Sequence, residues 1–219
     1  MDYDAVVLDN DGVISTMTDP AVMIRAVRDA FGDLGVVNPD QEDVEKLRYG
    51  VTPDILQTVA DRYGLKPGPF WFRRDMRSSL VQEREIRAGR KALYEDVGSL
   101  SDIDQPLGIV SSNQHRTVQT ILREYQMEDQ FETVYGREMD VQSLHKKKPN
   151  PHYLDLAIED LGAKNPLYVG DSETDVEAAV AAGIDSVFLR REHRATTKLD
   201  VAPTYEIETL EALPGLVST

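Results

Sequence analysis

Two aspartates near the start of the sequence, Asp9 and Asp11, are separated by one residue and followed by Gly12. Two carboxylates this close repel each other unless a cation or a shared proton lies between them, and Mg²⁺ is a cation that prefers oxygen ligands. A glycine at the next position permits a tight turn in an unusual backbone conformation. Asp and Gly are also common in ordinary turns, so this motif alone supports a metal or acid–base site and a simple polar turn about equally.

Two hydroxyl side chains, Ser111 and Ser112, follow an apolar run and precede a segment with helical periodicity. Hydroxyls and the free N–H groups of a helix N-terminus bind phosphate oxygens well, so these serines are candidate phosphate ligands. The competing interpretation is that Ser112 or Asn113 only caps the following helix. Taken alone, this segment favours capping.

A lysine run ends at Lys148, directly before Pro149, and is the only triple-lysine run of the chain. A lysine held in place before a proline-led helix start could neutralise a phosphoryl oxygen and the nearby carboxylates. The alternative is a solvated basic cluster, which is normal for exposed lysines.

Two more aspartates, Asp171 and Asp175, follow a further apolar run within residues 170–175. Either could complete a metal site that Asp9 and Asp11 begin. Acidic residues are also favoured in the first turn of a helix, and that alternative suits Asp175 better than Asp171.

Short apolar runs that alternate with helical patterns indicate the elements that would position these residues. The runs are 5–8, 107–110, 131–135, 167–169 and 186–189. This alternation predicts βαβ units and a parallel sheet, hence an α/β fold. Ligands bind at the carboxyl ends of the strands in such sheets, so we expect the four motifs to meet there.

A long insertion separates the first two predicted strands, with 98 residues between Leu8 and Leu107. One connecting helix needs far fewer. Asp19-Pro20 and Thr52-Pro53 each predict a helix start, and residues 70–90 have the pattern of a long third helix. We therefore expect an inserted all-helical module over residues 15–88.

The composition limits the expected compartment and partners. The absence of cysteine excludes disulfides, thiolate nucleophiles and cysteine-based zinc sites. Neither a signal peptide nor a run of ~20 apolar residues is evident, so we expect a cytoplasmic protein without membrane partners. The net charge of −15 disfavours nucleic acid as a partner.

The acidic surface also bears on the source of the protein. Asp outnumbers Glu 23 to 16, and Arg outnumbers Lys 16 to 8. Concentrated salt screens the repulsion within such a surface, so we interpret the source as halophilic, and specifically as haloarchaeal. The alternative is an ordinary acidic cytosolic protein.

Together and in this order, the four motifs resemble those of the haloacid dehalogenase-like (HAD) superfamily, over essentially the whole chain. The motifs are Asp9-Asn10-Asp11-Gly12, Ser111, Lys148 in Lys-Pro-Asn-Pro, and residues 170–175. The helical insertion is similar to the cap of the subclass that places it between the first and second motifs. The resemblance implies a Rossmann-like three-layer core of residues 1–14 and 89–219, with a central parallel sheet, and a helical cap domain of residues 15–88.

By the same resemblance, the chain is a Mg²⁺-dependent hydrolase of phosphate monoesters. Asp9 would be the nucleophile that forms an aspartyl-phosphate, and Asp11 would act first as acid and then as base. Mg²⁺ would bind Asp9, the main-chain carbonyl of Asp11, and Asp171. Asp175 would support the water shell of the metal or orient Lys148. The residues that would hold the phosphoryl group are Ser111, Ser112 and Lys148.

Alternatives within the superfamily stay open. The dehalogenases lack the second aspartate, because a leaving halide needs no proton, so Asp11 favours phosphate esters over a 2-haloacid. Phosphosugar mutases share all four motifs, and a non-catalytic phosphate-binding module is a further alternative. The expected substrate is a small phosphomonoester such as phosphoglycolate, and the expected state is a monomer or homodimer.

Substrate choice is expected to lie in the helical insertion. Arg48 and Tyr49 precede the Thr52-Pro53 helix start, and this turn could face the site. Arg48 could contact a second anionic group of the substrate, or it could be an ordinary surface arginine.

Overall fold

The computed structural model describes residues 3–218. Within this range six strands form one sheet in the order β3-β2-β1-β4-β5-β6, and every neighbouring pair is parallel. The strands are β1 (Ala5–Leu8), β2 (Leu107–Gln114), β3 (Thr133–Arg137), β4 (Pro166–Gly170), β5 (Asp185–Leu189) and β6 (Tyr205–Ile207). The predicted α/β class with a parallel sheet is confirmed.

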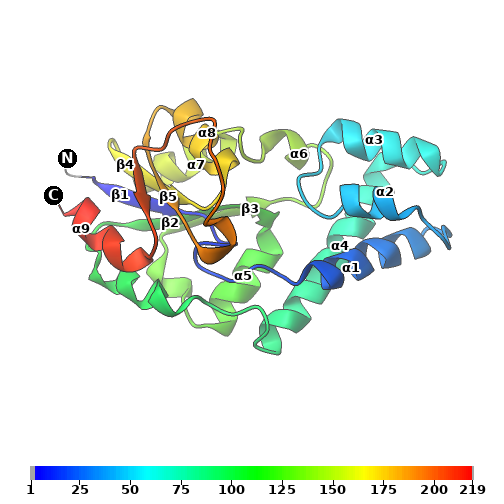
Figure 1. Cartoon of the computed structure of the whole chain (residues 1–219), viewed down its shortest axis with the longest axis horizontal. Coiled ribbons are helices and arrows are strands. Elements are labelled where there is room, and N and C mark those ends of the chain that lie inside the picture. The colour runs from blue at the N-terminus through cyan, green and yellow to red at the C-terminus, as the bar shows by residue number, and fades with distance from the viewer. Residues whose placement is uncertain (1–2, 219) are drawn as a thin grey trace.

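Helices cover both faces of this sheet and give a Rossmann-like three-layer arrangement (Figure 1). One face packs on α7 (His152–Leu161) and α8 (Glu173–Ala182), and the other packs on α5 (His115–Glu124) and α9 (Leu213–Val217). Successive residues of β1 belong to different hydrophobic clusters, with Val7 on the α7 side and its neighbours on the α5 side. This follows from the alternation of side chains along a strand.

Short 3-10 helices complete this part of the chain. They are η1 (Glu95–Asp102), η2 (Glu128–Gln130), η3 (Glu192–Arg194) and η4 (Leu210–Ala212), and one short α-helix, α6 (Ser143–Lys146), precedes the lysine segment. Both α7 and α8 end at a glycine in the left-handed conformation, Gly162 and Gly183, as such helix ends prefer.

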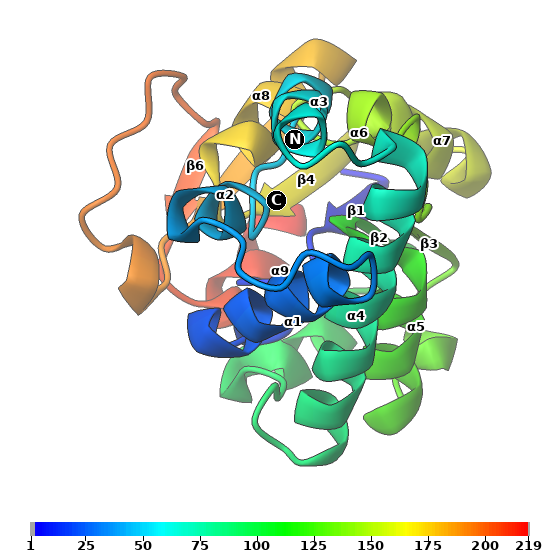
Figure 2. The same cartoon turned by 90° about the vertical axis from the view of Figure 1, so that its right-hand side faces the viewer.

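Four helices lie beside the sheet rather than in its covering layers (Figures 1 and 2). They are α1 (Pro20–Gly32), α2 (Gln41–Lys46), α3 (Pro53–Arg62) and α4 (Pro67–Arg87). The side chains of Asp19 and Thr52 cap α1 and α3, so both predicted helix starts are confirmed. These helices share a hydrophobic cluster that includes Phe31, Leu56 and Trp71.

The end of β2 differs from the expectation. The strand continues past Val110 because Gln114 pairs again with Arg137 of β3 after a shift in register. The N-cap position of α5 is therefore Gln114, and the idea that Ser112 or Asn113 occupies it is wrong. Within residues 3–218 no helix is both long enough and apolar enough to cross a bilayer.

Candidate active site

A cavity of about 610 Å³ lies between the carboxyl ends of β1, β2 and β4 and the helices α1 and α4. This volume is typical of a small-molecule site. The predicted site residues that line it are Asp9, Asp11, Arg48, Tyr49, Ser111, Ser112, Lys148 and Asp171. Asp175 is buried in the first turn of α8 and contacts Lys148.

Asp9 directly follows β1 and is almost entirely buried. Its main-chain N–H donates to the carbonyl of Val169 on β4, at 2.8 Å. Its Oδ1 lies 2.9 Å from Lys148 Nζ as an ion pair, but the orientation leaves this buried oxygen without a hydrogen bond among the described residues. Burial raises the pKa of Asp9 to about 8, against the opposing charge of Lys148. Asp9 Oδ1 is thus an acceptor still available to a ligand or cation.

Lys148 is held by three groups besides Asp9. Its ammonium donates to Asp175 Oδ1 at 2.5 Å, to the Tyr168 hydroxyl at 2.8 Å and to the Val110 carbonyl at 3.3 Å. Burial acts to lower the pKa of Lys148, but the charges of Asp175 and Asp9 raise it well above its ordinary value. Lys148 is therefore a fixed positive charge beside the Asp9 carboxylate.

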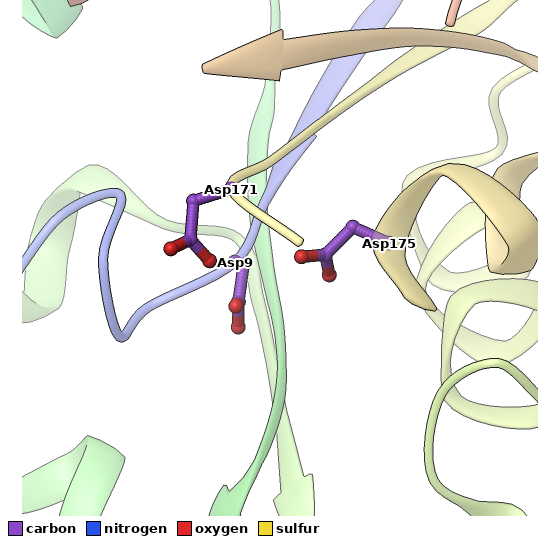
Figure 3. A group of neighbouring side chains, drawn as sticks. All are labelled: Asp9, Asp171 and Asp175. Carbon is purple, nitrogen blue, oxygen red and sulfur yellow. The ribbon is translucent and has the colours of Figure 1, made fainter. Parts of the chain in front are cut away.

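Three carboxylates, those of Asp9, Asp171 and Asp175, offer oxygen atoms within 4.8 Å of one another. Figure 3 shows them gathered around one point, from the end of β1, from the end of β4 and from α8. Oxygen ligands of this type suit Mg²⁺, and the Oδ1 of Asp9, which has no hydrogen bond among the described residues, agrees with a cation there. Asp175 is already engaged, because it accepts from Lys148 and from the Ser172 N–H at 3.0 Å. The residues present fit Mg²⁺, with Asp9 and Asp171 as the carboxylates that would hold it.

Gly12 allows the carboxylate of Asp171 to approach the loop that follows β1. Its φ is +86°, and a Cβ atom at this position would lie 2.6 Å from Asp171 Cγ. A side chain would therefore displace Asp171 as well as strain the turn. The absence of a side chain at Gly12 therefore allows Asp171, a candidate metal ligand, to keep its position.

Asp171 also contacts the 3-10 helix η3. His193 Nε2 lies 2.7 Å and Arg194 Nε 3.0 Å from its Oδ2. These contacts place a cation from the β5–β6 connection beside the acidic cluster.

Asp11 is bound by two residues from distant parts of the chain. The ammonium of the fully buried Lys91 forms an ion pair with its Oδ1, and Asn113 Nδ2 donates to its Oδ2 at 2.9 Å. Burial acts to raise the pKa of Asp11, but the charge and hydrogen bonds of Lys91 and Asn113 lower it below its ordinary value. Asp11 is therefore an ionised carboxylate in this arrangement.

The two serines differ in their surroundings. Ser111 is buried, and its Oγ accepts a hydrogen bond from the Asn113 N–H at 3.1 Å. The carbonyl of Ser112 accepts from Arg137 Nε at 3.3 Å. Both line the cavity, so the structure brings both candidate phosphate ligands to the carboxyl end of β2.

Arg48 and Tyr49 reach the cavity from the turn before α3. The guanidinium of Arg48 pairs with Glu45 at 3.3 Å and lies over the ring of Tyr49 at 5.3 Å. The Tyr49 hydroxyl donates to the Thr18 carbonyl at 3.2 Å, and burial raises its pKa to about 12. The expectation that this turn faces the site therefore agrees with its position.

A buried ion-pair cluster joins α4 to the end of β3. Asp75 accepts from both Nη atoms of Arg137, at 2.7 and 2.9 Å, and from Arg74 Nη1 at 3.0 Å. Both guanidinium groups also lie over the ring of Trp71, at 4.9 and 5.0 Å. Trp71, Arg74 and Arg137 line the same cavity as Asp9.

The family model for haloacid dehalogenase-like hydrolases matches residues 6–189, which include all four motifs. The chain belongs to this family. The family and hydrolase class predicted from the motifs are confirmed.

Curated relatives of this haloacid dehalogenase-like hydrolase have named activities. The chain is 28% identical to a 5'-nucleotidase of Pseudomonas aeruginosa over 83% of this chain and 80% of the relative. It is 26% identical to a phosphoglycolate phosphatase of Rhodobacter capsulatus over 97% of this chain and 96% of the relative.

Solved structures share the fold. CbbY from Rhodobacter sphaeroides, in complex with phosphate, superposes with a TM-score of 0.72 at 16% identity and covers 96% of each chain. The HAD-hydrolase YfnB from Bacillus subtilis, bound to magnesium, gives a TM-score of 0.61 at 19% identity over 100% of each chain. At these identities the likeness is one of fold alone.

The sequence did not point to several residues that shape this hydrolase's cavity. Lys91 is a single lysine after the last helix of the α1–α4 group, and Arg137 ends β3 without a recognisable motif. Tyr168, whose hydroxyl holds Lys148, reads in sequence as an ordinary residue of a buried strand. The role of each of these residues depends on a contact with a residue that is distant in sequence. No local sequence pattern indicates such a contact.

Proposed function

We propose that this hydrolase cleaves small phosphomonoesters in a Mg²⁺-dependent reaction through an aspartyl-phosphate on Asp9. The observation that carries the proposal is the buried Asp9 Oδ1, which lies beside the Lys148 ammonium and has no hydrogen bond among the described residues. A carboxylate so placed can act as a covalent nucleophile and split one difficult displacement into two easier steps. The named activities of the curated relatives, both on phosphate esters, support the same reaction class.

In the first step an oxygen of Asp9 bonds to phosphorus while the bond from phosphorus to the alcohol oxygen breaks. The leaving oxygen takes a proton from Asp11. Lys91 and Asn113 favour the ionised form of Asp11, but the dianionic phosphate of a substrate nearby raises its pKa and favours the protonated form. In the second step water attacks phosphorus, Asp11 accepts its proton, and inorganic phosphate leaves Asp9.

Positive charge and positioning supply most of the catalysis in phosphoryl transfer. Lys148 stands beside the nucleophile and is fixed by Asp175 and Tyr168, so it can offset charge on the phosphoryl oxygens. Ser111 and Ser112 would donate to the same group. When bound, Mg²⁺ would be held by Asp9, Asp171 and the main-chain carbonyl of Asp11, and it would add positive charge at those oxygens. Asp175 would act as a positioning residue for Lys148.

We also propose that residues 15–88 form a cap over a core of residues 1–14 and 89–219. The chain segments that leave and re-enter the sheet layers lie side by side, with the Thr16 N–H donating to the Ala92 carbonyl at 2.8 Å and a bridge between Ser15 and Leu93. The α1–α4 region supplies most of one hydrophobic cluster, which Leu144 joins from the proposed core. A cap of this kind excludes bulk water from the reacting groups.

Phosphate release from a panel of phosphomonoesters tests the proposal, with Mg²⁺ in one series and EDTA in the other. We expect turnover only with Mg²⁺, and we expect Asp9→Asn to lower it by roughly a thousandfold or more with little effect on folding. Asp54→Asn, on the exposed start of α3, is the matched control and should keep the wild-type rate. Full activity of Asp9→Asn would show that the nucleophile is another residue. Isomerised sugar phosphate with little free phosphate would identify a mutase instead.

A further inference from the structure

Lys147 is a half-buried cation in the active-site cavity that has no partner of its own among the described residues. The preceding helix, α6, ends just before it, and its side chain lines the cavity next to that of Lys148. Lys148 binds Asp9 and Asp175, whereas the ammonium of Lys147 has no hydrogen bond or ion pair with any residue between positions 3 and 218. Half-buried charges are normally paired, so this ammonium is available to an anion.

Two more buried donors in the cavity lack acceptors within residues 3–218. The indole N–H of Trp71 and Nε of Arg48 have no hydrogen-bond partner in the described part of the chain, and both residues line the cavity. Trp71 is itself almost completely buried. Unsatisfied buried donors are costly and rare in native proteins, and an acceptor from a ligand would satisfy them.

The charges around these donors sum to a positive value. Asp75 is one acid shared by two cations, Arg74 and Arg137, so this buried cluster keeps a charge of one positive unit. Among the acids that line the cavity, Asp11 pairs with Lys91 and Asp171 with Arg194, whereas Asp9 shares Lys148 with the buried Asp175. The charge of Lys147 is therefore added to that of the Arg74–Asp75–Arg137 cluster, whose two cations act on it.

The same surroundings act on the ammonium itself. Burial, and then the charges of Arg137 and Arg74, lower the pKa of Lys147 to about 8. An anion bound beside Lys147 would remove this repulsion.

We infer that Lys147, Trp71 and Arg48 form a second anion-binding subsite, so that the substrate is a phosphomonoester whose alcohol part carries a second anionic group. This group is a carboxylate or a second phosphate. All three side chains offer only donors, which suits an anion better than a neutral polyol that must also donate. The inference rests on the proposed function for the phosphoryl end of the substrate.

Kinetics with paired esters test the subsite. Phosphoglycolate and a sugar bisphosphate carry a second carboxylate or phosphate, and ethyl phosphate carries neither. We expect kcat/KM to favour one of the anionic esters, and Lys147→Met to reduce its advantage over ethyl phosphate by about tenfold, mainly through KM. Lys147→Arg should restore much of the advantage. Lys146→Met, at the neighbouring lysine that does not line the cavity, should leave the ratio unchanged. Equal loss for all esters, or no change, would overturn the subsite.

Binding without turnover separates this inference from the proposed reaction. Calorimetric titration of the Asp9→Asn protein, with Mg²⁺, measures the affinity for each ester directly. We expect tighter binding of an ester with a second anionic group, and loss of this preference in Asp9→Asn/Lys147→Met. A retained preference in the double variant would refute the subsite. If the preference depends on Lys147 but the wild type releases no phosphate from any ester, the subsite stands and the proposed function fails.

Discussion

Lys91 places its ammonium between the Asp11 carboxylate and the carbonyl of Thr16, which it contacts at 2.7 Å. Lys91 is fully buried and Asp11 mostly so. The pair therefore joins the loop after β1 to the chain segment that follows α4. Removing one member of a buried ion pair leaves the other charge uncompensated.

We expect Lys91→Met to lower the free energy of unfolding by about 3 kcal/mol near pH 7. Lys91 depresses the folded-state pKa of Asp11, so its stabilisation is present above the unfolded pKa of the carboxyl and is lost as the pH falls through the folded pKa. In the variant this pKa rises, and the acid limb of the pH–rate profile should move to higher pH. Urea unfolding at pH 7 and at pH 3 measures the first effect. The double variant Asp11→Asn/Lys91→Met should regain part of the lost stability, and an unchanged midpoint in Lys91→Met would contradict the pairing.

Gly12→Ala should impair Mg²⁺ binding more than it impairs folding. The new Cβ would meet Asp171 Cγ at 2.6 Å, and the left-handed backbone adds strain of about 1–3 kcal/mol. The matched control is Gly35→Ala, because Gly35 has a similar φ of +83° and no atom within 4 Å of a Cβ there. Calorimetric Mg²⁺ titration and thermal unfolding compare the two variants. Equal Mg²⁺ affinity in both would show that Gly12 is needed for its backbone alone.

Lys147→Met should stabilise the fold in a pH-dependent way. The folded-state pKa of Lys147 is lowered to about 8 from 10.5, so the unfolded chain binds more protons between these values and the contribution of Lys147 to stability rises with pH across that window. The stabilising effect of the substitution is therefore largest below pH 8 and fades toward pH 10.5. Denaturation of wild type and variant at pH 7 and 10 gives the difference in their free energies of unfolding at each pH. A difference that increases with pH would contradict the prediction.

Molar KCl tests the halophilic interpretation of the surface. A net charge of −15 creates repulsion that concentrated salt screens. We expect the thermal unfolding midpoint to rise by about 10 °C or more between dilute buffer and 2 M KCl, a rise that corresponds to roughly 3 kcal/mol of stabilisation for a chain of this size. A flat response would identify an ordinary acidic protein.

Much of the fold was predictable because its signals are local. The runs that became β1, β4 and β5 are short and mostly apolar, and Asp19, Thr52, Gly162 and Gly183 mark helix ends by side-chain or backbone chemistry. The structure adds β6 and α2, which the sequence did not indicate. With three and six residues, they are too short to show a period.

In the candidate site, too, residues with a local sequence signal could be predicted, and residues whose roles depend on distant contacts could not. Asp9, Asp11 and Asp171 could be proposed from the sequence because they follow strands whose carboxyl ends share one edge of the sheet, and Lys148 because it ends the triple-lysine run before Pro149. Lys91 and Arg137 were missed because their roles depend on partners 80 and 62 positions away. Lys147 was not singled out, because the sequence does not distinguish it from its neighbour Lys148. In the structure Lys148 pairs with two carboxylates, whereas Lys147 pairs with none of the described residues.

If a second anionic group binds as proposed, the cluster of Arg74, Asp75 and Arg137 would make the affinity for the substrate depend on the position of α4. Moving α4 away from β3 would separate Asp75 from Arg137 and admit water around the cations, and a wetter surrounding weakens their pull on an anion. Closure of the cavity and tighter binding of a doubly anionic molecule would then occur together, and opening of the cavity would release it.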